Sequence, residues 1–386
     1  MLKAFKYKLR RPSKAFAAQC ESALEVCREL YNAALQERRD AWKLNRQSVS
    51  WSAQCAQLPQ IKPLRPDVAE VHSQVLQATL RRLQRSFENF FRRVKAGEKE
   101  AGWPRFKSRR RFDSFTYSQS GFRLEGDKLS LSKIGSCRVH LSREIEGTIK
   151  TCTVKREADG WYVIFTADNV PARELPQTGA TVGVDLGLEN FATFSNGAPP
   201  IPHPRHLRAA ERRLKTAQRA VSRKKKRGAN RKKAVKLLAK QQQTVKRQRQ
   251  DFAHKESLHL LRQYDEIAVE DLNIKGMVKN HHLAKAISDA AWGTFLNILE
   301  AKAEEAAKRV WKVSAPYTSQ DCSGCGHRMK KTLAEREHRC SACGLHLHRD
   351  HNAALNIQAR AVPLGMSTVR LASEPRISIS NAAVGV

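Results

Sequence analysis

Acidic residues are scarce in this sequence. Its 386 residues include 37 Asp and Glu against 71 Lys and Arg, which gives a formal net charge of +34. Ordinary solubility requires a net charge of only about 2–8, so a merely solvated surface does not account for this excess. Because neutralising phosphates releases counterions and strengthens binding, so basic a chain indicates a nucleic-acid partner.

Long apolar stretches are also missing. No segment approaches the ~18 consecutive apolar residues that span a bilayer, and the basic start MLKAFKYKLRRPSKAF lacks the apolar core of a secretion signal. The nine cysteines are odd in number, and those outside one tight cluster have no regular spacing, which argues against a disulfide framework. We therefore expect no membrane association and a chain that is used whole in a bacterial cytoplasm or nucleoid.

Apolar residues recur at three- and four-residue steps in the first hundred residues, which predicts helices over 13–45 and 66–95. The second helix carries arginines on its opposite face, and the segment Gly102–Phe112 alternates aromatic and cationic residues. This pattern favours a surface that follows a phosphate backbone. The candidate backbone contacts are Arg81, Arg85, Arg105, Lys107 and Arg109.

The periodicity changes to two between residues 112 and 169, which predicts β-strands. Asp159-Gly160 separates two strand-like runs and is typical of a tight hairpin. We expect a small antiparallel barrel or sheet that residues 3–10 join as a first strand. The preceding helices would then be an insertion into this β-domain, and 171–179 would be a linker.

Strands and helices alternate in the second half of the chain. The apolar runs TVGVDLG and IAVEDLNIKGM predict strands, and they flank a very basic helical hairpin over 203–256. A further amphipathic helix is expected over 284–309. This alternation is typical of an α/β domain with a mixed sheet.

Four cysteines form the most specific motif. Cys322-x2-Cys325 and Cys340-x2-Cys343 each lie on a glycine-containing turn, so that four thiolates can converge on one ion. Such a set predicts a closed, tetrahedral structural site for one Zn²⁺. A zinc ribbon by itself is compatible with a nucleic-acid-binding or adaptor protein and does not indicate catalysis.

Three carboxylates are candidates for catalysis. Asp185 and Glu270 each end an apolar strand, and Asp350 immediately precedes a helical segment. An acid at the end of a buried strand is costly unless it is paired or binds a cation. If the three acids meet at one edge of a sheet, they can bind two Mg²⁺ ions for in-line phosphodiester cleavage. The residues alone leave open whether they meet.

The motifs GVDLGLENFATFSNG, VEDLNIKGM, AKAISDAAWGTF, TSQDCSGCG with CSACG, and RDHNAALNI occur in this order. Together with LYNAAL, QVLQATLRRLQRSFENFFRRVKAGEK and PRFKSRRRFDSFTY, they resemble the TnpB proteins, the RNA-guided nucleases of transposons related to type V CRISPR effectors. The resemblance covers residues 1–360. It implies that Asp185, Glu270 and Asp350 are the catalytic, magnesium-binding acids.

The resemblance also implies an α+β multidomain fold. Its parts would be an RNase H-like RuvC nuclease domain with a mixed sheet, a zinc ribbon, and an N-terminal β-barrel wedge domain carrying a helical recognition lobe. The expected ranges are 1–12 with 100–172 for the wedge, 13–99 for the lobe, 173–180 for a linker, 181–316 with 347–364 for the nuclease, 317–346 for the ribbon and 365–386 for an irregular tail.

By the same resemblance, the expected function is RNA-guided cleavage of DNA. The partners are a guide RNA from the transposon end and target double-stranded DNA, with one protein or a dimer per RNA. The guide pairs with one DNA strand beside a short adjacent motif, and basic helices bind the hybrid through its backbone. A zinc-ribbon regulator of the transposon and a guide-independent transposase or resolvase remain as alternatives.

The residues that read the adjacent motif are expected in the N-terminal lobe. We nominate Gln74 and Gln77, because an amide can form two hydrogen bonds with adenine, and Trp51 for stacking. Ordinary surface positions are the alternative for each.

Overall fold

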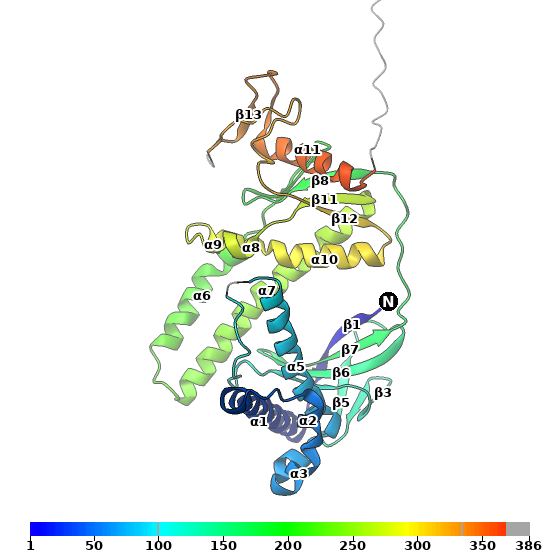
Figure 1. Cartoon of the computed structure of the whole chain (residues 1–386), viewed down its shortest axis with the longest axis vertical. Helices are drawn as coiled ribbons and strands as arrows, with labels where there is room; N and C mark the ends of the chain where they lie inside the picture. Colours follow the sequence, from blue (N-terminus) through cyan, green and yellow to red (C-terminus); the bar gives the residue numbers. More distant parts are fainter. Residues whose placement is uncertain (99, 333–334, 368–386) are drawn as a thin grey trace, which may run out of the picture. The chain divides into compact units, whose positions relative to one another are not determined.

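The computed structural model describes residues 1–98, 100–332 and 335–367 (Figure 1). The expected irregular tail at 365–386 therefore lies largely outside the described residues. The chain divides into two compact units, Met1–Pro171 and Ala172–Val386. Over the described ranges, no helix is both long and apolar enough to cross a membrane.

The first unit contains a seven-stranded antiparallel sheet with the strand order β2-β6-β7-β1-β5-β4-β3. Strand β1 lies between β7 and β5, with Phe5 opposite Phe165 and Leu9 opposite Val139, so the first strand joins the β-domain as the sequence predicted. The strands are β1 (Lys3–Arg10), β2 (Ser114–Tyr117), β3 (Phe122–Glu125), β4 (Lys128–Leu131), β5 (Gly135–His140), β6 (Thr148–Glu157) and β7 (Gly160–Asp168). Within the described residues, no pairing joins the edge strands β2 and β3.

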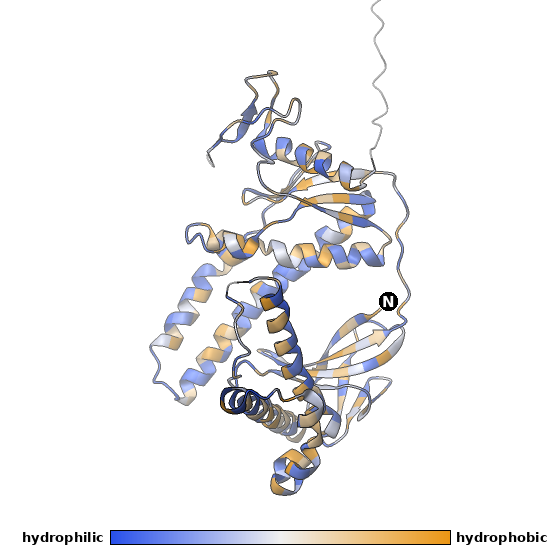
Figure 2. Ribbon diagram, in the orientation of Figure 1, coloured by the Kyte–Doolittle hydropathy of each residue, from blue (hydrophilic) through white to orange (hydrophobic). Residues whose placement is uncertain are grey.

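The helices of the first unit pack on this sheet through one continuous core. Phe16, Leu24 and Leu83 are among the helical residues in the same buried cluster as Phe115 and Phe165 of the sheet. The helices are α1 (Lys14–Asn45), α2 (Trp51–Ala56), α3 (Leu58–Leu64), α4 (Pro66–Ala69) and α5 (Ser73–Lys95). Hydrophobic and hydrophilic residues alternate along α5 in Figure 2. The single helix predicted over 66–95 is wrong, because α4 ends at Ala69 and His72 caps a new helix.

The second unit contains a five-stranded mixed sheet with the order β10-β9-β8-β11-β12. Strand β8 pairs antiparallel with β9 and parallel with β11, and β11 pairs parallel with β12. The strands are β8 (Thr181–Asp185), β9 (Asn190–Phe194), β10 (Ile201–Pro202), β11 (Glu266–Glu270) and β12 (Arg309–Val313). The apolar runs that end in Asp185 and Glu270 thus form strands, as predicted, and the structure shows that these strands are neighbours in the sheet.

Two long helices form the basic hairpin of this unit, followed by shorter helices. The hairpin helices are α6 (His206–Ser222) and α7 (Ala229–Gln263). The helices that follow are α8 (Ile274–Met277), α9 (Ala284–Ala290), α10 (Trp292–Glu305) and α11 (Arg349–Ala361), with a 3₁₀ turn, η1, at Val362–Leu364. The continuous helix predicted over 284–309 is wrong. Ala291 has a φ of 54° and separates α9 from α10, and residues 309 and 310 already belong to β12.

A glycine in strand β8 determines how closely α11 approaches the sheet. A Cβ at Gly183 would collide with the carbonyl oxygen of Ala354 and would lie 2.8 Å from the backbone nitrogen of Gln358. Both belong to α11, whose residues Ala354 and Ile357 are fully buried. Gly183 therefore permits the contact between helix and strand that places the start of α11 beside the end of β8.

Replacing Gly183 with Ala is expected to lower the free energy of unfolding by about 1–3 kcal/mol, because α11 must move away from β8. Thermal or urea unfolding of the full chain measures this loss. Gly293→Ala is the matched control, since its added Cβ would meet Ile274 at an ordinary 3.4 Å. Equal stability of the two variants would contradict the packing argument.

Candidate active site and zinc centre

Two acidic side chains lie at the same edge of the mixed sheet. Strands β8 and β11 are parallel neighbours with Val184 opposite Val269, so Asp185 and Glu270 follow at the same end. Because parallel strands run in the same direction, residues at matching register positions lie at the same end of the sheet. Glu270 is 8% exposed and Asp185 is partly exposed.

The third acid reaches this edge from a different element. Asp350 lies in the first turn of α11, and the ring nitrogen of His348 accepts a hydrogen bond from its backbone nitrogen and caps the helix. A carboxylate in the first turn is also favoured by the helix dipole. The structure therefore brings together the three acids that the sequence singled out.

The three carboxylates repel one another. Burial raises the pKa of Asp185 well above its ordinary value of 3.8, and the negative charges of Glu270 and Asp350 raise it further, against a smaller opposing effect of Arg349. Burial also raises the pKa of Glu270. Arg349 and Arg360 offset only part of the effects that raise these pKa values, and divalent cations, which prefer oxygen ligands, would supply further positive charge.

Thr318 positions one of these acids. Its hydroxyl donates to Oε1 of Glu270 at 2.5 Å, and Thr318 itself is only 4% exposed. This hydrogen bond favours the ionised carboxylate and opposes the effect of burial. Thr318 is the first residue of the TSQDC run, but the sequence alone does not predict its role. Nothing in one sequence indicates a contact between residues that are 48 positions apart.

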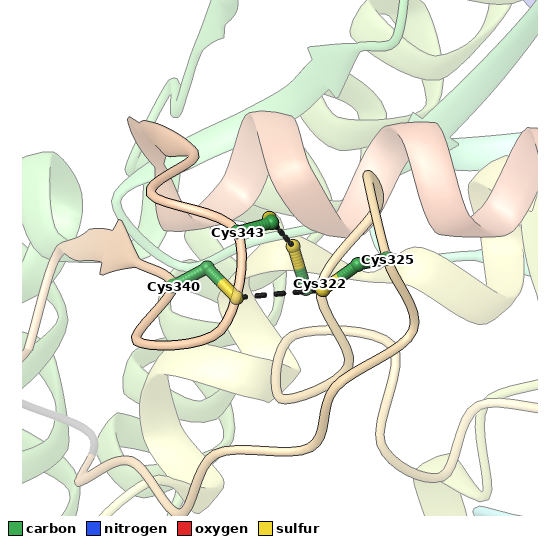
Figure 3. A group of neighbouring side chains, drawn as sticks. All are labelled: Cys322, Cys325, Cys340 and Cys343. Carbon is green, nitrogen blue, oxygen red and sulfur yellow. Dashed lines mark hydrogen bonds between the residues drawn. The ribbon is translucent and has the colours of Figure 1, made fainter.

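The four cysteines of the ribbon converge as predicted (Figure 3). Their sulfur atoms all lie within 4.8 Å of one another, and the Cys322–Cys343 and Cys325–Cys340 pairs are each 3.6 Å apart. Zn–S bonds of about 2.3 Å in a tetrahedron require sulfurs about 3.8 Å apart. The backbone N–H of Cys343 lowers the pKa of Cys340 to about 6, which favours the thiolate. The cluster therefore fits one zinc ion.

The zinc centre is connected directly to the acidic site. Strand β14 (His346–His348) pairs with β13 (Glu337–Arg339) in the ribbon and runs straight into α11, which carries Asp350. The buried amide of Asn352 binds Ser323 N and Asp321 O on either side of Cys322. The ribbon thus holds both the start of α11 and the segment that contains Thr318.

The residues nominated for reading DNA lie together in the first unit. Trp51, Gln74, Gln77, Arg81 and Arg85 line one cavity of about 670 Å³ between α5 and the sheet. The amide of Gln74 is engaged by Ser118 and Gln119, whereas none of the described residues binds the side-chain amide of Gln77. Arg81 stacks over the ring of Trp51, with 5.3 Å between its guanidinium and the ring centroid.

The remaining backbone candidates lie outside this cavity. Lys107 is fixed through its main chain, whose N–H and C=O both bind the side chain of Asn32 on α1. Arg109 lies 3.7 Å from Glu25 and is 71% exposed, and Arg105 is also exposed. Their side chains therefore form a separate basic surface along α1.

Three segments match known families. Residues 153–281 match a family described as "Probable transposase", 292–357 match the Cas12f1-like TNB domain, and 1–47 match a helix-turn-helix domain. In this chain, residues 1–47 instead form strand β1 and the single long helix α1.

Two relatives match nearly the whole chain. A Streptomyces pristinaespiralis protein named as a candidate RNA-guided DNA endonuclease is 37% identical over 92% of this chain and 89% of its own length. The candidate RNA-guided DNA endonuclease InsQ of Escherichia coli K12 is 28% identical over 93% of this chain and 92% of its own length. The solved structure of a mini RNA-guided endonuclease, CRISPR-Cas phi3, matches 94% of this chain and 92% of its own with 10% identity and a TM-score of 0.49.

Asp185→Asn is expected to raise the melting temperature in Mg²⁺-free buffer at pH 8. The raised pKa means that the folded state disfavours the ionised carboxylate, so its cost grows as the pH rises from about 3.8 through the folded-state pKa. A neutral amide removes this cost, and the difference should shrink as the pH falls. Differential scanning calorimetry measures it, and added Mg²⁺ should stabilise the wild type but not the variant. A lower melting temperature for Asp185→Asn would show that the carboxylates do not repel.

Cys340→Ser is expected to lose one zinc per chain, because a tetrahedral thiolate site does not close with three sulfurs. Elemental analysis measures the zinc content. Added Mg²⁺ should also raise the melting temperature of this variant by less than that of the wild type, because the ribbon holds Thr318 and the start of α11. Cys152→Ser, a buried thiol of the first unit, is the control that should retain the metal. Full zinc content in Cys340→Ser would remove Cys340 from the ligand set.

Proposed function

Because the chain belongs to the TnpB family, whose members named above are described as RNA-guided DNA endonucleases, we propose that it cleaves DNA under the direction of a guide RNA. The observation that carries this proposal is the convergence of Asp185, Glu270 and Asp350 at one sheet edge beside a zinc ribbon. A binding protein has no use for three repelling carboxylates, whereas a nuclease requires them.

The proposed catalytic residues are the three acids. Their hard oxygen ligands fit two Mg²⁺ ions, which would activate water and stabilise the leaving 3′-oxygen. Asp185 and Glu270 would bind from the fixed strand ends, Asp350 from the helix, and Thr318 would orient Glu270. The cleavage is a hydrolysis, in which water adds to the phosphorus and the 3′-oxygen departs with a proton.

The finer domain assignments are part of the same proposal. The strand order β10-β9-β8-β11-β12, antiparallel on one side of β8 and parallel on the other, supports an RNase H-like RuvC domain. The seven-stranded sheet would be the wedge domain, and α1–α5 the recognition lobe inserted after β1. The nuclease would act in the cytoplasm, as a monomer or dimer on each RNA.

Two features support the proposed nucleic-acid partners. The net charge of +34 is spread over α5, the Gly102–Phe112 segment and the α6–α7 hairpin, which is more surface than one short duplex covers. The cavity formed by Trp51, Gln74 and Gln77 combines amides with arginines, which suits reading a base edge next to phosphates. We propose that it reads the DNA motif adjacent to the target.

Cleavage is expected to require the cognate RNA and to move to a new site when the guide sequence is rewritten, because base pairing supplies the specificity. The assay measures cutting of matched and mismatched plasmids in Mg²⁺. Asp350→Ala is the control, and it should bind the RNA and target but leave the DNA intact.

Two outcomes would overturn the proposal. Site-specific cutting that persists after RNase treatment would indicate a guide-independent nuclease. RNA-directed binding without cutting by the wild type, under all divalent ions tested, would indicate a regulator that uses its zinc ribbon to bind DNA.

A further inference from the structure

A second cavity in the first unit is built from aromatic side chains. Its volume is about 660 Å³, within the range of about 300–1,000 Å³ of small-molecule sites. The walls come from α1, α5, the segment 47–52 and Trp103. The aromatic lining residues are Trp42, Trp51, Phe87, Phe90, Phe91 and Trp103.

Several of these rings remain open to solvent. Trp42 is 47% exposed, Phe91 58% and Trp103 53%. Trp103 is held by its neighbours, with its ring centroid 4.6 Å from that of Phe90, and it meets Phe87 edge-on. Exposed aromatic faces that are packed from behind form a platform on which a flat ligand can stack.

A buried arginine lining the same cavity has an unmet hydrogen-bond donor. Arg38 is only 9% exposed, its Nε donates to Gln54 at 2.9 Å, and its Nη1 donates to Gln84 at 2.8 Å. Its guanidinium lies over the ring of Phe87 at 5.2 Å. Among the described residues, its buried Nη2 has no partner. Arg38 therefore contributes a fixed positive charge to the wall of the cavity.

The surroundings of the cavity select the kind of ligand. Arg81 lines it, Arg46 lies over the ring of Trp42, and α5 adds the exposed Arg92 next to Phe91. These cations match a phosphate backbone that carries a base into the cavity. They oppose a second copy of this chain, which would bring the same positive charges to the same surface.

We propose that this aromatic cavity binds an unpaired base of the guide RNA, stacked on Trp103 and Phe91. The inference rests on the proposed function, because it takes the guide RNA as the partner. Folded RNA presents splayed, unpaired bases in its loops and bulges, which aromatic side chains and arginine recognise. The target strand instead has its bases paired with the guide.

The test compares Trp103→Leu with Trp103→Phe in the full-length protein bound to its cognate RNA. Leucine keeps apolar bulk but removes the stacking face, whereas phenylalanine retains one. Trp103→Leu is expected to weaken RNA binding about 5- to 100-fold, and Trp103→Phe by less than about threefold. The salt dependence of binding should keep its slope, because no phosphate contact is lost.

Leu44→Ala is the matched control, because Leu44 is 75% exposed on the same helix as Trp42 and does not line the cavity. It should bind RNA as the wild type does. Melting temperatures establish that each variant is folded. Equal RNA affinity of Trp103→Leu and the wild type would overturn this inference alone, whereas a wild type that binds no cognate RNA would overturn the proposed function as well.

Ultraviolet crosslinking followed by mass spectrometry identifies the occupant. A peptide that contains Trp103 or Phe91 joined to one guide nucleotide is the expected result. Crosslinks at these residues only to target DNA would overturn the assignment to RNA. A dimer that light scattering detects in the wild type and not in Trp103→Leu, with unchanged RNA affinity, would assign the cavity to a second protein copy.

Discussion

Three carboxylates that repel one another are the constraint on which the second unit depends. Burial and the charges of Glu270 and Asp350 raise the pKa of Asp185, so this arrangement opposes folding while Asp185 is ionised. The pairing of β8 with β11 brings two acids to one edge regardless of this cost, because burial of the apolar residues of both strands favours folding. The fold thus supplies the free energy that holds the acids near one another.

The third acid requires a different kind of support. Asp350 lies on a helix and not on a strand, and two independent features place that helix. Gly183 lets α11 approach β8 closely, and the ribbon strand β14 leads directly into its first turn. Asn352 then links the helix to the turn that contains Cys322. The four-cysteine cluster can therefore influence the acidic site, through Asp350 and through the hydrogen bond from Thr318 to Glu270.

The sequence predicted the features that depend on local pattern. Apolar runs that end in an acid identified β8 and β11, and the spacing of the cysteines identified the zinc cluster, because both signals are short-range. The breaks at His72 and Ala291 were missed, since apolar periodicity continues across them while the backbone turns. The roles of Thr318 and Arg38 were missed for another reason, because each depends on partners distant in the chain.

Helix α5 brings two kinds of recognition surface together. Arg81 and Trp51 line both the amide-bearing cavity and the aromatic cavity, so the stacked pair forms a shared wall. One cavity presents amides and hydroxyls suited to the edge of a paired base, whereas the other presents ring faces suited to an unpaired one. Because the wall is shared, a base that displaces Trp51 on one side also changes the shape of the other cavity. The two proposed sites, one for RNA and one for DNA, are therefore coupled through the position of Trp51.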